Sequence, residues 1–82
     1  MGRRYPPLTP RDVEIIVKRL GFTFKRQNGS HAHWERPADD KGRTRAIVTI
    51  DMSIREFCRD LVNSMIRQSQ HSKKEFYAAL SA

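Results

Sequence analysis

The sequence predicts an α+β fold in which a three-stranded antiparallel sheet carries helices on one face. Apolar residues recur at helical spacing near both ends of the chain, whereas apolar and polar residues alternate in the middle. An Asn28-Gly29 pair divides the alternating part, and such a pair is typical of a tight hairpin turn. The element order is therefore helix, three strands, helix and a short terminal helix, which leaves the second face of the sheet open.

The first helix is predicted to follow Thr9, whose side chain can cap the free amides, and Pro10 suits its first position. Gly21 can adopt the left-handed conformation that ends such a helix. Residues 1–8 are expected to form a flexible lead, and 9–82 to form one domain. The helix has one apolar stripe, made of Val13, Ile16, Val17 and Leu20.

The strands are predicted over 22–28, 30–36 and 43–50, with a polar, turn-rich connection over 37–42. Side chains of a strand point alternately to its two faces. In the second strand the core side is assigned to Ala32 and Trp34, and the open side to His31, His33 and Glu35. In the third strand the core side is assigned to Ala46, Val48 and Ile50, and the open side to Arg45, Ile47 and Thr49.

Two capping-box patterns predict the helices after the sheet. The first, Ser53-Ile54-Arg55-Glu56, begins a helix whose apolar residues recur up to Ile66. Cys58 falls on the apolar side of that helix, so it is expected to be a buried structural thiol. The second pattern, Ser72-Lys73-Lys74-Glu75, begins the short terminal helix.

The charge of the chain predicts an anionic partner. Its 16 Lys and Arg against 9 Asp and Glu give a formal net charge of +7, and the isoelectric point is near 10.3, as in many nucleic-acid-binding domains. A basic surface without a specific ligand would explain this composition about as well. A single cysteine and the absence of a long apolar run favour a soluble cytoplasmic protein with no membrane contact.

His31 is the first candidate for chemistry, because imidazole can accept and donate a proton near neutral pH. RNA carries its own nucleophile, the 2′-hydroxyl, so its cleavage needs a proton acceptor, a proton donor and groups that stabilise the phosphate. His33, with its Cβ roughly 6 to 7 Å from that of His31, could assist. The alternative is that His31 is an ordinary solvated histidine and that His33 only contacts phosphate or orients its neighbour.

Candidate RNA contacts surround the two histidines. Lys25 and Arg45 share their predicted face, and the neighbouring Arg26 and Ser30 are assigned to RNA binding as well. Further basic residues at turns and strand ends could extend this surface, namely Arg36, Lys41 and Arg43. A metal site is not expected, because Cys58 is predicted to be buried and His71 lies in the loop between the last two helices, which leaves the His-x-His pair without a clustered third ligand. No cofactor is expected either.

The chain resembles the HicA family, the mRNA interferases of toxin and antitoxin pairs. The resemblance runs from about Asp12 to Leu80 and rests on Leu20-Gly21-Phe22, on the segments 26–31, 47–50 and 65–69, and on Lys74-Glu75-Phe76. It implies a fold similar to that of double-stranded-RNA-binding domains, metal-independent cleavage of mRNA with His31 as the catalytic residue, and a HicB antitoxin that covers the site. Many members have a proline and a basic segment after the third strand, where this chain has 51–55, and Arg55 could substitute there.

Two other functions fit the same residues. The sheet and its basic edge could bind structured RNA without cutting it. The chain could also be an inactive relative whose remaining role is to bind a protein partner. Cleavage of pure mRNA in EDTA, with and without His31→Ala, separates the enzyme from the binding module.

Overall fold

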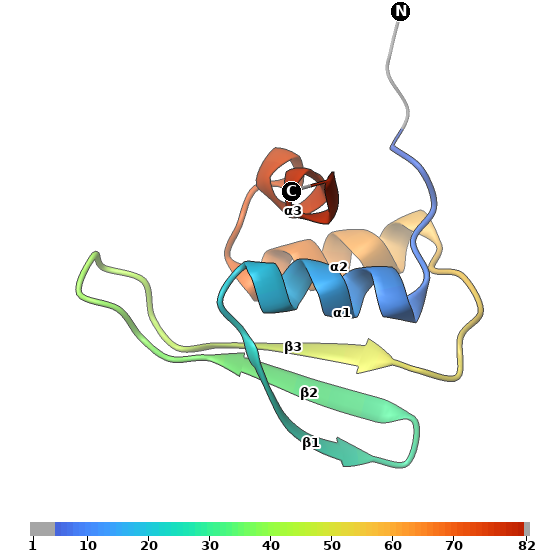
Figure 1. Ribbon diagram of the computed structural model, residues 1–82, viewed down its shortest axis with the longest axis horizontal. Helices are drawn as coiled ribbons and strands as arrows, with labels where there is room; N and C mark the ends of the chain where they lie inside the picture. Colours follow the sequence, from blue (N-terminus) through green and yellow to red (C-terminus); the bar gives the residue numbers. More distant parts are fainter. Residues whose placement is uncertain (1–4, 82) are drawn as a thin grey trace, which may run out of the picture.

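A computed structural model describes residues 5–81 as an antiparallel sheet of three strands with all three helices on one of its faces (Figure 1). This architecture and element order confirm the predicted α+β fold. The elements in chain order are α1 (Pro10–Arg19), β1 (Thr23–Asn28), β2 (His31–Arg36), β3 (Ala46–Asp51), α2 (Arg59–Ser69) and α3 (Lys73–Ser81).

Helix α1 begins as the sequence predicts. The backbone amide of Asp12 donates to Thr9 Oγ1 at 3.2 Å, and the amide of Thr9 donates to Asp12 Oδ2 at 3.0 Å. This reciprocal pair satisfies two amides that the helix itself leaves free. At the other end Gly21 has φ +95°, a conformation that favours glycine.

The register of the sheet decides which side chains share a face. β2 lies between β1 and β3, and His31 pairs with Asp51 while His33 pairs with Thr49. Ala32 is fully buried and Trp34 is 8% exposed, which confirms their core assignment. The third strand has the predicted alternation as well, since its buried residues are Ala46, Val48 and Ile50.

β1 contains an irregularity that the sequence does not reveal. Its register against β2 shifts between Phe24 and Arg26, so that Arg26 lies opposite His33. Lys25 also reaches the open face, where its Nζ lies 3.3 Å from Glu35 Oε1. A bulge places two successive residues against one partner residue. Both basic residues therefore adjoin the histidine face, although strict alternation would have separated them.

The predicted start of α2 is wrong. The capping box at Ser53 does not form, because both the amide and the hydroxyl of Ser53 donate to Asp51 Oδ1, at 3.0 and 2.6 Å. Phe57 is held in an extended bridge, its amide donating to the carbonyl of Leu8 at 2.8 Å. The helix therefore begins only at Arg59, and Cys58 precedes it as an exposed residue rather than a buried thiol.

The segment before α1 is more ordered than a flexible lead. Leu8, the last residue of the predicted lead, is fully buried and belongs to the hydrophobic core. The ring of Tyr5 stacks on Tyr77 of α3, with 4.3 Å between ring centroids. Residues 1–4 of the predicted lead lie outside the described residues.

Candidate functional site on the open sheet face

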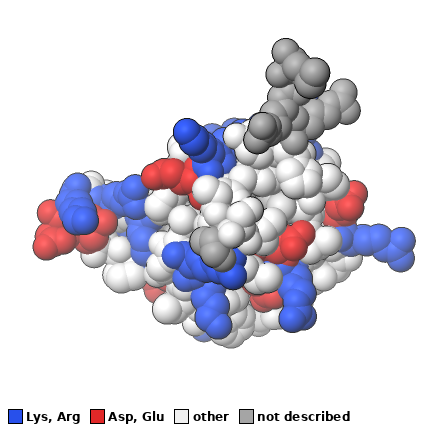
Figure 2. Space-filling view, turned by 45° about the horizontal axis from the view of Figure 1, so that its top comes forward, with Lys and Arg blue, Asp and Glu red and all other residues white. Residues whose placement is uncertain are grey.

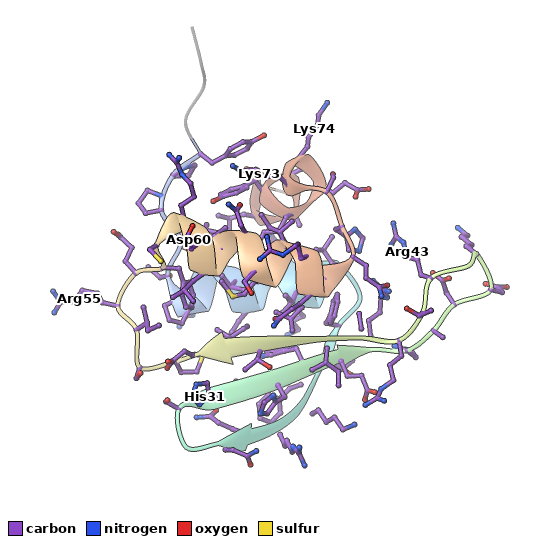
Figure 3. The ribbon with its side chains drawn as sticks, turned by 180° about the vertical axis from the view of Figure 1, so that it is seen from behind. His31, Arg43, Arg55, Asp60, Lys73 and Lys74 are labelled. Carbon is purple, nitrogen blue, oxygen red and sulfur yellow. The ribbon has the colours of Figure 1, made fainter. Side chains whose placement is uncertain are left out.

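His31 stands on the sheet face that the helices leave uncovered, directly after the turn that joins β1 to β2 (Figure 3). Gly29 gives this turn its positive φ of +58°. The His31 side chain is 55% exposed, and its Nε2 lies 3.7 Å from Asp51 Oδ2. A ring in this position is accessible to a large polyanion and has a carboxylate as its neighbour.

Asp51 is held as an anion. Hydrogen bonds from the hydroxyl and the amide of Ser53 are the main reason why the pKa of Asp51 lies below its usual value, and the Ser30 side chain adds to them. The negative charge next to His31 is thus present at neutral pH. Ser30, assigned to RNA binding from the sequence, contacts this carboxylate.

His33 is half-buried and has a partner across the strands. Its Nδ1 lies 3.1 Å from Thr49 Oγ1, the side chain of its pairing residue in β3. This contact fixes the ring orientation and leaves Nε2 without a role in the hydrogen bond. The two histidines lie on one face, His31 at the rim and His33 one pleat further along the strand.

Glu35 forms ion pairs with Lys25 and Arg45, the two residues that were predicted to bind phosphate. Arg45 donates to one carboxylate oxygen, and Lys25 Nζ lies 3.3 Å from the other. These bonds, Arg45 first, hold the pKa of Glu35 below its usual value. The side chains of Lys25 and Arg45 remain 42% and 56% exposed. The cluster carries one net positive charge and is accessible to solvent.

Arg36 does not extend the basic surface, contrary to the prediction. It is 7% exposed, and its guanidinium donates to the carbonyls of Ser69 and Thr44 at 3.1 and 3.0 Å and to Gln70 Oε1 at 2.6 Å. Its function is structural, because it joins the end of β2 to the end of α2. The sequence held a signal for this: Arg36 has the parity of the buried Ala32 and Trp34.

The loop between β2 and β3 does not add to the site either. Arg43 lies at the opposite end of the molecule from His31 (Figure 3) and contacts His71 Nε2 at 3.2 Å. The same loop carries Asp39 and Asp40 beside Lys41. On the face shown in Figure 2, basic and acidic side chains are interspersed and form no single basic patch.

The possible metal ligands are dispersed. His71 lies in the turn between α2 and α3, where its side chain is 8% exposed and its Nδ1 lies 3.4 Å from Glu75 Oε1. Burial, followed by the Arg43 charge, lowers the pKa of His71. Within residues 5–81, no three His, Cys, Asp or Glu side chains come close enough together to hold a metal ion.

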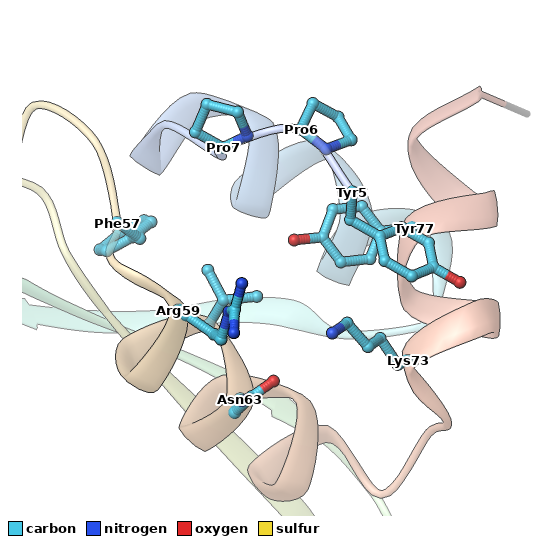
Figure 4. A pocket seen from close by; sticks show the side chains of 9 residues that line it. Tyr5, Pro6, Pro7, Phe57, Arg59, Asn63, Lys73 and Tyr77 are labelled. Carbon is cyan, nitrogen blue, oxygen red and sulfur yellow. The ribbon is translucent and has the colours of Figure 1, made fainter. Parts of the chain in front are cut away.

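Two surface hollows differ in their relation to the histidines. One of about 220 Å³ lies between β3 and α2 and includes His31 in its lining. Its α2 residues, none of which is a predicted site residue, are Leu61, Ser64, Met65 and Gln68. The larger, about 690 Å³, lies on the helix side around Tyr5, Arg59, Lys73 and Tyr77 (Figure 4) and contains none of the predicted site residues.

Comparison with protein families agrees with this arrangement. A family model described as "HicA toxin of bacterial toxin-antitoxin" matches residues 10–70, which include every strand and the helices α1 and α2. The chain belongs to the HicA toxin family. It is thus the toxin of a toxin–antitoxin system, a class that works with an antitoxin partner. Its fold is compatible with that of double-stranded-RNA-binding domains.

A search of curated proteins finds no match to this HicA family chain. None of the helices within the described part of the chain is long and apolar enough to cross a bilayer.

Proposed function

We propose that this HicA toxin is an endoribonuclease that cleaves mRNA in the cytoplasm without a metal, with His31 as its acid and base. The observation that carries the proposal is the position of His31, exposed at the rim of the uncovered sheet face with the Asp51 carboxylate 3.7 Å from its Nε2. A HicB-like antitoxin that covers this face would silence the toxin. Steric access and charge together favour an RNA backbone as the substrate.

In the proposed reaction His31 accepts the proton of an RNA 2′-hydroxyl. The 2′-oxygen forms a bond to the adjacent phosphorus, and the bond from phosphorus to the 5′-oxygen breaks. A proton returns to the leaving 5′-oxygen, so that the products are a 2′,3′-cyclic phosphate and a 5′-hydroxyl end. Asp51 stabilises the positive charge that His31 acquires, as an anion beside an imidazolium does.

The remaining residues of the face would bind the phosphate. Lys25 and Arg45 can turn from Glu35 towards a phosphate oxygen, because both side chains are exposed. Arg26, opposite His33, and Ser30, beside Asp51, complete the proposed RNA contacts. His33 assists, since the ring that Thr49 holds through Nδ1 has its second nitrogen free for a proton or a phosphate oxygen.

The test is cleavage of a labelled mRNA by pure protein in EDTA. General acid–base catalysis contributes about 10²- to 10⁴-fold, so His31→Ala should lower the cleavage rate by that factor. The variant should still bind RNA, because the cations of the site are unchanged. His33→Ala should lower the rate less.

Two results would contradict parts of this proposal. One is undiminished cleavage by His31→Ala, which would mean that the proton transfer belongs to another group. The other is intact RNA with the wild-type protein, shown to be folded, free of antitoxin and able to bind RNA, which would favour a non-catalytic RNA-binding module.

A further inference from the structure

We propose that the hollow between β3 and α2 is a subsite for one nucleobase of the RNA and that it prefers guanine and uracil. The proposal rests on the proposed ribonuclease function, because it places this base next to the phosphate that His31 serves. His31 and Asp51 form one side of the hollow, and α2 forms the other.

The size and the apolar lining suit a single ring system. The hollow measures about 220 Å³, less than the roughly 300 Å³ at which pockets for whole drug-sized ligands begin. Its apolar residues are Ile54, Phe57, Leu61 and Met65. Leu61 is 42% exposed although it is a large aliphatic side chain. Phe57 and Met65 are already buried, so the apolar surface that a flat base would remove from water belongs to Leu61 and to the half-buried Ile54.

Gln68 gives the hollow a hydrogen-bond donor. The backbone amide of Thr49, on the edge of β3, donates to Gln68 Oε1 at 3.2 Å. Because an amide N–H can only donate, the side-chain atom that faces it must be the oxygen. The NH₂ group of Gln68 is therefore left to donate elsewhere. The Ser64 hydroxyl, one helical turn earlier in the same lining, takes part in none of the side-chain hydrogen bonds found among residues 5–81.

The lining argues against the other occupants. It contains no Lys or Arg that could pair with a phosphate or an acidic side chain inside the hollow. An apolar side chain of a protein partner would cover the Gln68 amide and the Ser64 hydroxyl without giving them hydrogen bonds, which is unfavourable. A nucleobase is uncharged, so it needs no Lys or Arg in the lining, and its polar edges can form hydrogen bonds with Gln68 and Ser64.

The donor also selects among the bases. Guanine and uracil present a carbonyl oxygen where adenine and cytosine present an amino group. The NH₂ group of Gln68 can donate to the carbonyl but would oppose the amino group, a donor like itself. One such hydrogen bond corresponds to roughly a two- to twelvefold preference.

The decisive variant is Gln68→Glu. One carboxylate oxygen can still accept from the Thr49 amide, and the other replaces the donor by an acceptor, so the preference should move towards adenine and cytosine. The control is Asn63→Asp, which adds the same charge to α2 outside the hollow. The probes are four uncleavable 2′-O-methyl hexanucleotides that are abasic except for one guanine, uracil, adenine or cytosine. Cleavage ends in one mRNA, mapped by sequencing, give a second readout.

These measurements test the base preference of the hollow independently of the ribonuclease activity. A wild-type preference for guanine and uracil that Gln68→Glu reverses, and that Asn63→Asp keeps, supports the subsite even if no RNA is cut. Cleavage by the wild type without any preference that depends on Gln68 overturns the subsite and leaves the ribonuclease intact. A Leu61→Ser variant that binds the hexanucleotides normally but no longer binds its antitoxin would assign the hollow to the protein partner and overturn the proposal as well.

Discussion

The two faces of the sheet are made from the same short strands, yet they have opposite chemical character. On the covered face Ala32, Val48 and Ile50 are fully buried beneath the helices. On the open face the neighbours of these residues, His31, His33 and Thr49, meet solvent and one another. Successive residues of one strand thus belong alternately to the core and to the candidate site. Substitutions on the covered face should therefore change stability, and substitutions on the open face should change activity.

Truncation of Phe22 should produce the largest change in stability. Its side chain is 1% exposed, and replacing a buried phenylalanine by alanine costs about 3 to 5 kcal/mol. Phe24, two residues along the chain, is 52% exposed and forms a T-shaped aromatic pair with Trp34. Urea unfolding followed by the fluorescence of Trp34 should show a much lower midpoint for Phe22→Ala than for Phe24→Ala. Equal losses would mean that exposure does not distinguish the two sites.

On the open face, His31→Ala should lower the cleavage rate without lowering stability. Because its side chain is 55% exposed, its removal should leave the urea midpoint close to that of the wild type. A variant that lost cleavage and unfolded early would break the separation between the faces.

The same substitution at a buried arginine, Arg36, and at an exposed one, Arg45, should separate an effect on stability from an effect on RNA binding. Arg36→Met leaves the buried carbonyl of Ser69 and that of Thr44 without a donor, which should lower the free energy of unfolding by about 2 to 4 kcal/mol. Arg45→Met should leave unfolding unchanged and weaken RNA binding instead. A plot of log binding constant against log salt should become shallower by about 0.7 to 0.9, the value of one phosphate contact.

The reverse assignment would contradict this prediction. If Arg36→Met lowered the salt dependence and kept its stability, the buried guanidinium would have to leave Ser69 and bind RNA.

His71 should give the smallest effect, and its sign follows from its surroundings. Burial and Arg43 lower the pKa of His71 from 6.5, so the folded protein binds a proton less readily than the unfolded chain. The neutral His71 ring therefore contributes to the stability of the folded protein. This contribution is fully present above pH 6.5 and is lost as the pH falls through the lowered pKa. Stability measured between pH 7 and 5 should therefore decline less in His71→Gln, whose amide oxygen can still accept from Arg43.

A decline of equal size in both proteins would assign the pH dependence to other groups. The carboxylates with lowered pKa, such as Glu35 and Asp51, lose their contribution only at more acidic pH, below their ordinary pKa values of 4.5 and 3.8.

Local patterns predicted the elements whose causes are local. The Thr9 cap of α1 and the Ser72 cap of α3 both form, since each needs only residues three positions apart. Strand alternation placed His31 on the open face and Trp34 in the core, because the pleat is a property of the strand itself. The same rule, applied to Arg36, would have placed its side chain on the core side.

The errors arose where distant residues compete with a local pattern. Ser53 has the sequence of a capping residue, but Asp51 accepts its hydrogen bonds. Leu8 and Phe57 are 49 positions apart, so neither segment alone reveals their bridge. Gln68 has no pattern that connects it to His31, and only the packing of α2 beside β3 brings both into one hollow.

The order of the elements, the parity of each strand and the excess of positive charge could be predicted from the amino-acid sequence, because they depend on residue type and short-range spacing. Which cations Glu35 binds, which arginine is buried and where the second helix starts became visible only in the folded protein. Those outcomes depend on hydrogen bonds and ion pairs between segments far apart in the chain, and such partners become neighbours only when the helices pack on the sheet.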